Sequence, residues 1–581
     1  MIAVFLLFSF SLYAGEVSGE YRKWHPMEIH FHGPEAKELD TEPNPFLDYR
    51  LQVLFTSPRG VEYNVPGFFN GDGKGEGNGD VWTVRFTPDE QGHWTYQVSF
   101  RYGKNVATGP DQDAGQPLAF DGETGEFFVQ PLDPGSPGFL KWGRLGYCGG
   151  HYLKFTDGPY WIKGGTDTPE DLLSYADFDN TSLAGHTYAG YINEWRHHDP
   201  TWKGGKGKGM IGLLNYLASR HVNSIYFLVQ NIGGDGKNVW PFAGEIDPDG
   251  DPGNDNIHYD VSKLDQWNIV FDHAQRHGIF LHVVLNEAEE MNKRELDEGE
   301  LGVERKLFYR ELIARFGHHN ALQWNLSEEY DLDLELTPER IKEFAQYITD
   351  VDPYDHPVTV HNEGRDPDPG WLPFLGDERI STTSFQFYQG NARWGERVEK
   401  WRLLTRISGR PLPINLDEFM PAGADNHAQI RKEMLWPTYL SGGSLEYIFE
   451  TQLRGDGFRE LEELWQWTWY ARSFMHEHLP FWEMEPDDLS LVGATKQLGG
   501  PQVFSKHGEI YAIYLPVARP GGELTMWRVK GLFEQQWYNP RQGQFEGTAR
   551  RFEAGGTISL GDAPREPDED WVVLIRKVED R

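Results

Sequence analysis

The strongest constraint on the fold is an alternation of apolar runs and helical patterns between residues 140 and 485. Eight apolar runs of strand length are separated by stretches whose apolar residues have helical spacing. Sustained alternation of this kind predicts a parallel sheet. A doubly wound open sheet would alternate similarly, but no Gly-x-Gly-x-x-Gly phosphate-binding sequence follows the first run, and eight units favour closure into a (β/α)₈ TIM barrel. The runs occupy residues 160–165, 223–229, 279–285, 321–325, 357–361, 380–387, 413–417 and 444–449.

The regions on either side of this alternation have a different pattern. Residues 18–130 contain short alternating runs separated by Gly, Asn, Asp and Pro, which predicts an N-terminal β-sandwich. A Pro- and Gly-rich linker at 131–138 ends that domain. Residues 487–581 return to short alternating strands and predict a C-terminal β-sandwich. The expected fold is therefore multidomain, with a TIM barrel at 140–485 between two β-sandwiches. Three N-terminal tryptophans are expected in the sandwich core rather than on a sugar-binding surface: Trp24, Trp82 and Trp94.

The N-terminus and the charge indicate where the protein acts. Residues 1–15 form an apolar run that ends in small residues, and the run is too short to span a membrane, so they predict a signal peptide. The formal net charge of −36 excludes binding to nucleic acid through a basic surface. The single cysteine, Cys148, excludes an intramolecular disulfide. We expect a secreted or periplasmic protein with no membrane span and no cofactor, and its oligomeric state stays open.

Polar side chains follow almost every predicted strand of the barrel. One such residue is usually a helix cap or a solvated loop residue. A whole set at matching strand ends indicates a site, because barrel enzymes build their active sites from the C-terminal ends of the strands. The candidates, in chain order, are Asp167, Asn231, Asp235, Glu287, Glu328, Glu329, His361, Gln386, Tyr388, Glu418 and Glu450.

Two opposed carboxyl groups are the minimum requirement for cleaving a glycosidic bond. One carboxyl group must be protonated to assist the leaving oxygen, and the other must be ionised to attack the anomeric carbon or to activate water. Strands four and seven face each other across a closed eight-stranded barrel. Glu329 and Glu418 are therefore expected about 5 Å apart, which is the spacing of a retaining mechanism. Like-charge repulsion and burial would separate the pKa values of the two groups.

The Trp-x-Leu-x-x-Glu sequence at 324–329 and the glutamate that ends strand seven resemble the retaining glycoside hydrolases of the large (β/α)₈ clan with two catalytic glutamates. This resemblance implies that Glu329 is the acid/base and Glu418 the nucleophile. The clan usually has an asparagine where this chain has Glu328, so either Glu328 or Glu329 could be the acid.

Nearly the whole mature chain also resembles a bacterial family of glycoside hydrolases of unassigned substrate. Its members have an N-terminal β-sandwich of unknown function, a barrel and a C-terminal domain described as collagen-binding. The matching stretches include Asn44-Pro45-Phe46, Arg315-Phe316-Gly317-His318-His319, Asp352-Pro353-Tyr354-Asp355-His356-Pro357 and Trp537-Tyr538-Asn539-Pro540. The resemblance supports this architecture and does not supply a substrate.

We therefore expect a secreted hydrolase that cleaves O-glycosidic bonds of a poly- or oligosaccharide with retention. One alternative is a non-catalytic carbohydrate-binding or adhesion protein with a degenerate barrel, although such a protein would not need glutamates on opposite strands. Another is a polysaccharide lyase, which would need Tyr or His as a base and Arg or Lys to neutralise a uronate. The acidic run between Asp247 and Asp255 could bind Ca²⁺, but it lacks EF-hand spacing and is more simply a solvated loop, so no metal is expected.

Overall fold

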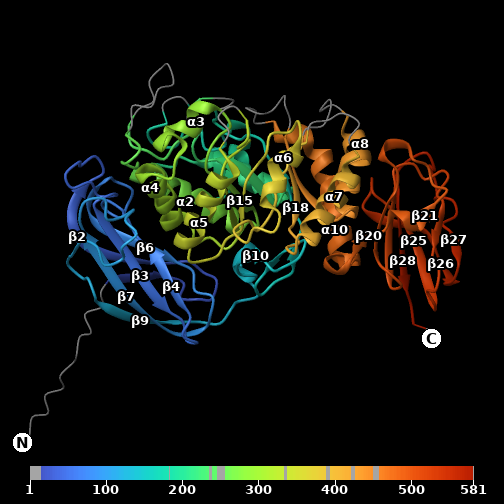
Figure 1. Ribbon diagram of the computed structural model, residues 1–581, viewed down its shortest axis with the longest axis horizontal. Coiled ribbons are helices and arrows are strands. Elements are labelled where there is room, and N and C mark those ends of the chain that lie inside the picture. Colours follow the sequence, from blue (N-terminus) through green and yellow to red (C-terminus); the bar gives the residue numbers. More distant parts are fainter. Residues whose placement is uncertain are drawn as a thin grey trace, which may run out of the picture.

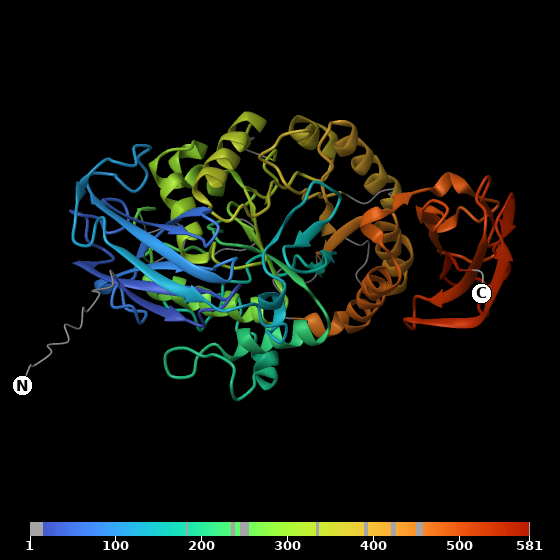
Figure 2. The ribbon, with the colours of Figure 1, turned by 90° about the horizontal axis from the view of Figure 1, so that it is seen from below.

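The computed structural model describes residues 15–181, 184–233, 239–244, 255–332, 336–387, 393–419, 426–448 and 457–579. The chain forms three regions along its longest axis (Figure 1). An N-terminal β-sheet region and a C-terminal β-sheet region lie at the two ends, and helices surround a parallel sheet between them. The view from below shows these helices arranged around the central strands (Figure 2). The predicted multidomain order is confirmed.

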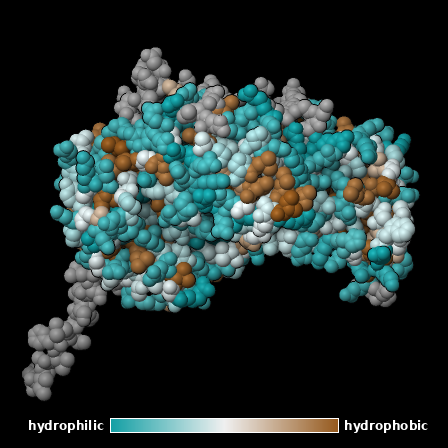
Figure 3. Space-filling model, in the orientation of Figure 1, coloured by the Kyte–Doolittle hydropathy of each residue, from teal (hydrophilic) through white to brown (hydrophobic). Residues whose placement is uncertain are grey.

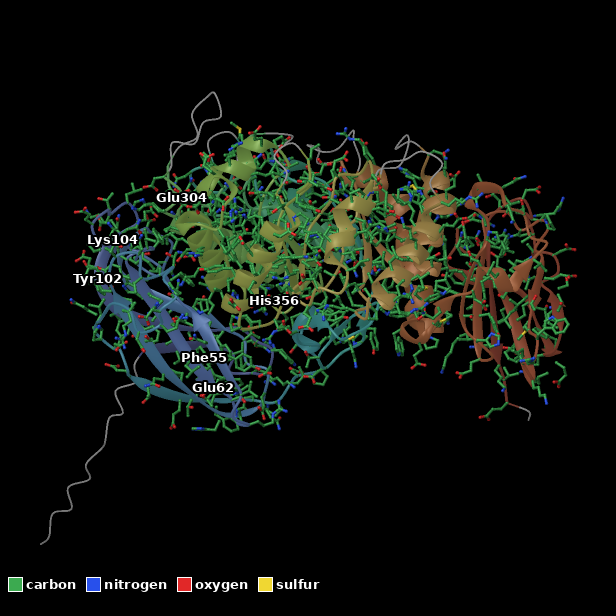
Figure 4. All side chains as sticks on the ribbon, viewed as in Figure 1. Phe55, Glu62, Tyr102, Lys104, Glu304 and His356 are labelled. Carbon is green, nitrogen blue, oxygen red and sulfur yellow. The ribbon has the colours of Figure 1, made fainter. Side chains whose placement is uncertain are left out.

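Two antiparallel sheets form the N-terminal region. Phe55 of β3, labelled in Figure 4, stacks on Phe86 of β6 with 4.1 Å between ring centroids, so aromatic contacts join the two sheets. Trp82 and Trp94 are each at most 1% exposed and lie in the predicted core. Trp24 is equally buried, but it packs against residues beyond the N-terminal sheets, where its indole N–H donates to Asp157 at 2.6 Å and Arg144 lies over its ring. The first sheet has the order β1 (Glu16–Gly19), β2 (Met27–Lys37), β6 (Asn78–Phe86) and β5 (Phe68–Phe69). The second has the order β4 (Glu62–Pro66), β3 (Tyr49–Thr56), β7 (Gly92–Tyr102) and β8 (Gln116–Pro117), and β9 (Thr124–Val129) also pairs with β7.

The N-terminal sheets contact the central region through arginines of helix α4 (Val303–Phe316). The Arg310 guanidinium donates to the backbone carbonyls of Gly67 at 3.0 Å and of Leu51 at 2.8 Å. Arg315 donates to the carbonyl of Phe69 at 2.9 Å. Both guanidinium groups are buried, so these hydrogen bonds satisfy donors that have lost contact with water.

Within the described residues, seven strands form one parallel sheet in the order β17-β16-β15-β14-β13-β19-β18. The predicted run at 160–165 is divided. Tyr160–Trp161 form β12 of a small antiparallel sheet with β10 (Leu145–Tyr147) and β11 (Leu153–Phe155), and the first parallel strand is β13 (Gly164–Thr166). The others are β14 (Ser224–Leu228), β15 (Phe280–Val284), β16 (Leu322–Asn325), β17 (Val358–Thr359), β18 (Ile414–Phe419) and β19 (Gly443–Tyr447).

The predicted run at 380–387 lies between the two outer strands of this sheet without forming a regular strand. Isolated parallel bridges join His361 to Ser384 and Phe385 to Leu416. A side chain replaces part of the backbone-to-backbone hydrogen bonding here, because the backbone N–H of Asn415 donates to Thr383 Oγ1 at 2.9 Å. The sheet therefore curls until its outer strands β17 and β18 both contact this segment.

Helices follow the strands in sequence, as the alternation predicts. Helix α2 is capped by Asp260, whose carboxylate accepts from the Lys263 amide at 2.9 Å and so satisfies one of the first free amides of the helix. The helices are α1 (Lys208–Ser219), α2 (Val261–Arg276), α3 (Glu290–Glu295), α4, α5 (Pro338–Val351), α6 (Pro367–Trp371), α7 (Trp394–Ile407), α8 (His427–Ile430), α9 (Trp436–Leu440) and α10 (Glu462–His478).

The C-terminal region contains a six-stranded and a three-stranded antiparallel sheet. Arg431, just after α8, makes two 2.9 Å hydrogen bonds to the buried carboxylate of Asp570, which fixes this region to the central one. The larger sheet has the order β20 (Glu485–Pro486), β22 (Gln502–Lys506), β23 (Ile510–Leu515), β28 (Trp571–Lys577), β25 (Leu532–Asn539) and β26 (Gln544–Glu553). The smaller one has the order β21 (Leu491–Val492), β24 (Glu523–Thr525) and β27 (Thr557–Ser559).

The face seen in Figure 3 is largely hydrophilic and carries only small apolar patches. Among the described residues, no helix has both the length and the apolar content that a membrane span requires.

Candidate functional site

Side chains at the C-terminal ends of β16, β17 and β18 meet at one face of the parallel sheet. The nearest nitrogen and oxygen atoms of Glu328, His361 and Glu418 lie within 4.8 Å of one another. His361 Nε2 is 3.3 Å from Glu418 Oε2. All three side chains are buried, so their charges interact with little screening by water.

His361 is a neutral member of this group. Burial and the nearby Lys163 lower the pKa of His361 to about 3. Its Nδ1 lies 3.2 Å from the hydroxyl of Tyr226. A proton on Nε2 would face the Glu418 carboxylate and would leave Nδ1 free to accept from Tyr226. In this arrangement Tyr226 orients the imidazole, and Nε2 lies beside Glu418 Oε2 at 3.3 Å without hydrogen-bond geometry.

Glu328 also belongs to a second group of acids. Carboxylate oxygens of Glu170, Glu287 and Glu328 lie within 4.8 Å of one another, and all three residues are buried. Burial raises the pKa of Glu328 well above its ordinary value, and the charges of Glu170, Glu287 and Glu418 raise it further. Burial and the charge of Glu170 likewise raise the pKa of Asp167. Carboxyl groups this close cannot all be ionised unless a cation joins them.

Glu329 differs from Glu328 in exposure and surroundings. It is partly exposed, whereas only 3% of Glu328 is exposed. Burial raises the pKa of Glu329 to about 7, although a hydrogen bond from Gln386 lowers it. Lys293 donates to the backbone carbonyl of Glu329 at 2.8 Å. A carboxyl group with this pKa can both give and take a proton near neutral pH.

The backbone is left-handed at both Glu329, with φ of 31°, and Glu418, with φ of 52°. Residues other than glycine adopt such angles at a cost, and strained positions of this kind concentrate at functional sites. At Glu418 the angle accompanies a register shift of β18 between Leu416 and Phe419. The shift breaks the usual alternation of strand side chains, so Asp417 and Glu418 are both buried on the inner side of the sheet.

A buried network lies inside the parallel sheet next to this group. Lys163 Nζ is 3.0 Å from Asp417 Oδ1 and 3.0 Å from Glu446 Oε2. His282 Nδ1 is 2.7 Å from Glu446 Oε2, and Ser224 also hydrogen-bonds Glu446. Burial raises the pKa of Asp417 to about 6 although Lys163 lowers it. The network keeps Lys163 charged and fixes the strand that carries Glu418.

The structure brings together seven of the residues predicted from strand ends. Asp167, Glu287, Glu328, His361 and Glu418 belong to the acidic groups, and Gln386 and Glu329 are hydrogen-bonded beside them. Asn231 is buried, but its described contacts are backbone hydrogen bonds with Val239. Asp235, Tyr388 and Glu450 lie outside the described residues.

Sequence reasoning missed four residues of these groups. Glu170 lies five residues beyond a predicted strand end, and its position alone gave no signal. Lys163 and Glu446 lie within or just before strands, where a charged residue in an apolar run is the signal that could have found them. Tyr226 could not be distinguished from the core residues of its apolar strand, because its ring is typical of a core residue and only its hydroxyl contributes to the site.

Both acidic groups have ligands that a metal ion could use. Three carboxylates, such as those of Glu170, Glu287 and Glu328, suit a hard cation such as Ca²⁺, and a group that includes His361 suits a transition metal better. Protons shared between the carboxyl groups allow the same short distances between their oxygens, because the raised pKa of Glu328 keeps that group protonated. The chemistry of the acids therefore does not require a metal.

Two family models match the ends of the chain. Residues 20–101 match a domain of unknown function (DUF5060). Residues 486–576 match a family described as "Putative collagen-binding domain of a collagenase". A comparison with curated proteins found no match.

Several solved structures share the fold. A protein described as a "putative glycoside hydrolase" from Bacteroides vulgatus is 16% identical, with a TM-score of 0.67, and the match covers 96% of this chain and 99% of that one. A family 5 glycoside hydrolase from the same organism is 16% identical, with a TM-score of 0.55 over 76% of this chain and 95% of that one. A further structure titled "Glycoside hydrolase" is 15% identical, with a TM-score of 0.54 over 77% and 99% of the two chains. The likeness to the first of these shows a fold shared along almost the whole chain.

Proposed function

We propose that the protein is a glycoside hydrolase that cleaves O-glycosidic bonds of a poly- or oligosaccharide with retention. The observation that carries the proposal is the gathering of buried carboxyl groups at the C-terminal ends of β16 and β18, where burial raises the pKa values of Glu328 and Glu329. Glycoside hydrolysis needs such a pair, with one group ionised and the other protonated. The fold shared with solved structures named as glycoside hydrolases supports the same reaction class.

Glu418 is the proposed nucleophile. Its carboxylate lies beside His361, whose Nε2 is 3.3 Å away, and a proton on that nitrogen would favour the ionised form of the carboxylate, which attacks the anomeric carbon. Glu418 would then form a glycosyl-enzyme ester, which water hydrolyses in the second step. The left-handed backbone of Glu418 is consistent with a residue held for function.

Glu329 is the proposed acid/base. Its pKa of about 7 leaves much of it protonated at neutral pH, so it can protonate the leaving oxygen and later deprotonate water. Its partial exposure also suits a group that must reach a substrate and solvent. Glu328 suits the acid role less well, because it is buried among other acids. As a neutral carboxylic acid beside Glu418, Glu328 would instead donate a hydrogen bond and hold the nucleophile.

The other strand-end residues would shape the sugar subsite. We assign this role to Asp167, Asn231, Glu287, His361 and Gln386, together with Asp235, Tyr388 and Glu450. The proposed architecture is a (β/α)₈ barrel at 140–485, closed by the segment at 380–387, between β-sandwiches at 18–130 and 487–581. A signal peptide at 1–15 would direct the protein to the periplasm or the outside of the cell.

The test is release of reducing ends from a panel of plant and algal polysaccharides. Wild type is compared with Glu418→Gln, Glu329→Gln and Glu328→Gln. Loss of at least about a hundredfold in the first two variants, a typical cost for removing a catalytic group, supports the assignment. Proton NMR of the first product formed should show the anomeric configuration of the substrate.

External azide separates the two adjacent glutamates. It should restore activity to Glu329→Gly by replacing the base-assisted water and give a glycosyl azide of retained configuration. Azide acting on Glu418→Gly should give the inverted azide, because it replaces the nucleophile. Rescue of Glu328→Gly with retention would move the acid role to Glu328. Equal glycan binding by all variants without any cleavage would instead support a carbohydrate-binding protein.

A further inference from the structure

A second cleft lies at the opposite end of the parallel strands from the carboxyl groups. It has a volume of about 690 Å³, within the range of small-molecule sites. Asn223, which lines it, directly precedes β14, and Gly278 lies two residues before β15. The carboxyl groups follow the other ends of these strands. A five-residue strand spans roughly 16 Å, so the two sites are separate.

The cleft contains a buried guanidinium without a carboxylate partner. Arg472 of α10 is 4% exposed and makes no ion pair among the described residues. One of its terminal nitrogens donates to the backbone carbonyl of His221, and its Nε has no hydrogen-bond partner there. Burial lowers the pKa of Arg472 to about 10, so the group is still charged at neutral pH. Buried charges are normally paired, and this one is not.

Among the described residues that line the cleft, Glu477 is the only carboxylate, and no ion pair joins it to Arg472. Burial and Arg472 itself lower the pKa values of His221 and His476, and that of His476 falls to about 4, so both rings are neutral. The other cations that line the cleft are Lys141, Arg196 and Arg276. Arg276 is paired with Asp272 at 2.8 Å. In a chain of net charge −36, this cleft is a local concentration of positive charge.

Aromatic rings form much of the remaining wall. Trp142, Tyr160 and Trp469 line the cleft, and each is partly exposed. Trp469 is held in place by His221, which stacks on it with 3.9 Å between ring centroids. Fixed aromatic rings offer apolar faces to the CH groups of a pyranose, and a guanidinium binds a carboxylate through two parallel hydrogen bonds.

We propose that this cleft binds an acidic carbohydrate, a uronate-containing oligosaccharide whose carboxylate pairs with Arg472 and whose rings contact the aromatic wall. A simple anion would satisfy Arg472 alone and would leave the aromatic wall without a role. This second site does not depend on the proposed hydrolysis, because it uses none of the carboxyl groups at the other end of the sheet.

The test uses calorimetric titration of the Glu418→Gln protein, so that no cleavage disturbs the measurement. The probes are an oligogalacturonate, its methyl ester of the same length and inorganic sulfate. We expect the acid form to bind about ten- to a hundredfold more tightly than the ester, since hydrogen bonds to charged groups contribute about 1.5–3 kcal/mol. Trp142→Ala and Arg472→Met should each weaken binding of the acid form by about tenfold or more.

Hydrogen exchange locates the bound probe and guards against a variant that fails to fold. Wild-type protein with the oligogalacturonate should gain protection at residues 218–223 and 469–477. Equal affinity for acid and ester would overturn the proposal, as would no binding at millimolar probe or protection confined to residues 327–330. Sulfate that binds as tightly as the oligosaccharide would overturn the carbohydrate assignment.

Discussion

Lys163 and Asp417 form an ion pair inside the parallel sheet, with the ammonium 3.0 Å from a carboxylate oxygen of the residue that precedes Glu418. Both side chains are at most 1% exposed. Lys163→Met would leave Asp417 and Glu446 without their shared cation, a loss that costs about 3–5 kcal/mol. Urea unfolding should show this decrease, whereas Lys154→Met, at an exposed position, should change the free energy of unfolding by less than about 0.5 kcal/mol. A Lys163→Met protein as stable as wild type would contradict the assigned role of the pair.

The pKa of Glu329 predicts how activity depends on pH. An acid catalyst acts in its protonated form, so activity should fall as pH rises through about 7. The measurement is a pH profile of kcat/KM on whichever substrate is cut. In Glu329→Gln the residual activity should no longer fall in this range. An alkaline limb that persists unchanged in Glu329→Gln would assign the limb to another group.

Gln386→Leu should move the alkaline limb to higher pH. The Gln386 side chain donates to Glu329 and thereby lowers its pKa. A hydrogen bond of about 1 kcal/mol corresponds to somewhat less than one pKa unit, so a shift of roughly half to one unit is expected. Gln346→Leu, on the exposed surface of α5, provides the control. A shift to lower pH would show that Gln386 does not stabilise the ionised form.

Glu328→Gln should stabilise the protein, and more so at higher pH. The pKa of Glu328 is raised on folding, so the folded state binds a proton that the unfolded state has lost above about pH 4.5. Stability therefore falls by up to about 1.4 kcal/mol per pH unit as pH rises from there toward the raised pKa. The amide side chain of the Glu328→Gln variant does not titrate, so this dependence of stability on pH is lost. Thermal unfolding at pH 5 and pH 7.5 tests it, with exposed Glu463→Gln as the variant that should behave alike at both.

Asp570→Asn should weaken the attachment of the C-terminal region. Asp570 is fully buried and binds Arg431 through two hydrogen bonds, and Arg541 lies 3.2 Å away. Removing the carboxylate leaves buried Arg431 with only the more distant Glu569, at 3.9 Å, and losing one partner of a buried pair costs about 3–5 kcal/mol. Calorimetry should show an earlier transition of this region. Arg565→Gln breaks an exposed pair with Glu546 and should leave this transition nearly unchanged. Identical transitions in the two variants would contradict the prediction.

Much of the fold follows from local pattern. Helix α5 begins after Thr337 and buries Ile341, Phe344 and Ile348, as its spacing predicts. The apolar residues of an amphipathic helix identify the face that packs against the core. The structure of the segment at 380–387 was harder to predict. Its composition suits a strand, but Thr383 uses its side chain to bond the neighbouring strand, and only tertiary structure decides between side-chain and backbone partners.

The candidate site was predictable in kind more than in geometry. Strand ends gave Glu418, Glu328 and His361, because parallel strands end on one face. It could not be predicted from the sequence that Glu328, and not Glu329, would lie among the other buried acids. The left-handed backbone at Glu329, with φ of 31°, is a departure from regular strand geometry that the sequence pattern does not show. Lys163 stands out as a charge in an apolar run, but its role could not be predicted, because its partners Asp417 and Glu446 lie more than 250 residues away in the chain.

The arginines of α4 contact the N-terminal sheets through main-chain carbonyls of Leu51, Gly67 and Phe69. Every residue type carries a carbonyl, so this contact does not depend on which side chains the sheets display. Substitutions at Leu51 and Phe69 can therefore keep these hydrogen bonds, provided that the backbone path is kept. Attachment depends on the side chain at Arg85, which pairs with Asp265 at 3.1 Å, and at Thr87, which donates to the His318 carbonyl at 2.6 Å, so these positions should change more slowly in evolution than the carbonyl-bonded ones.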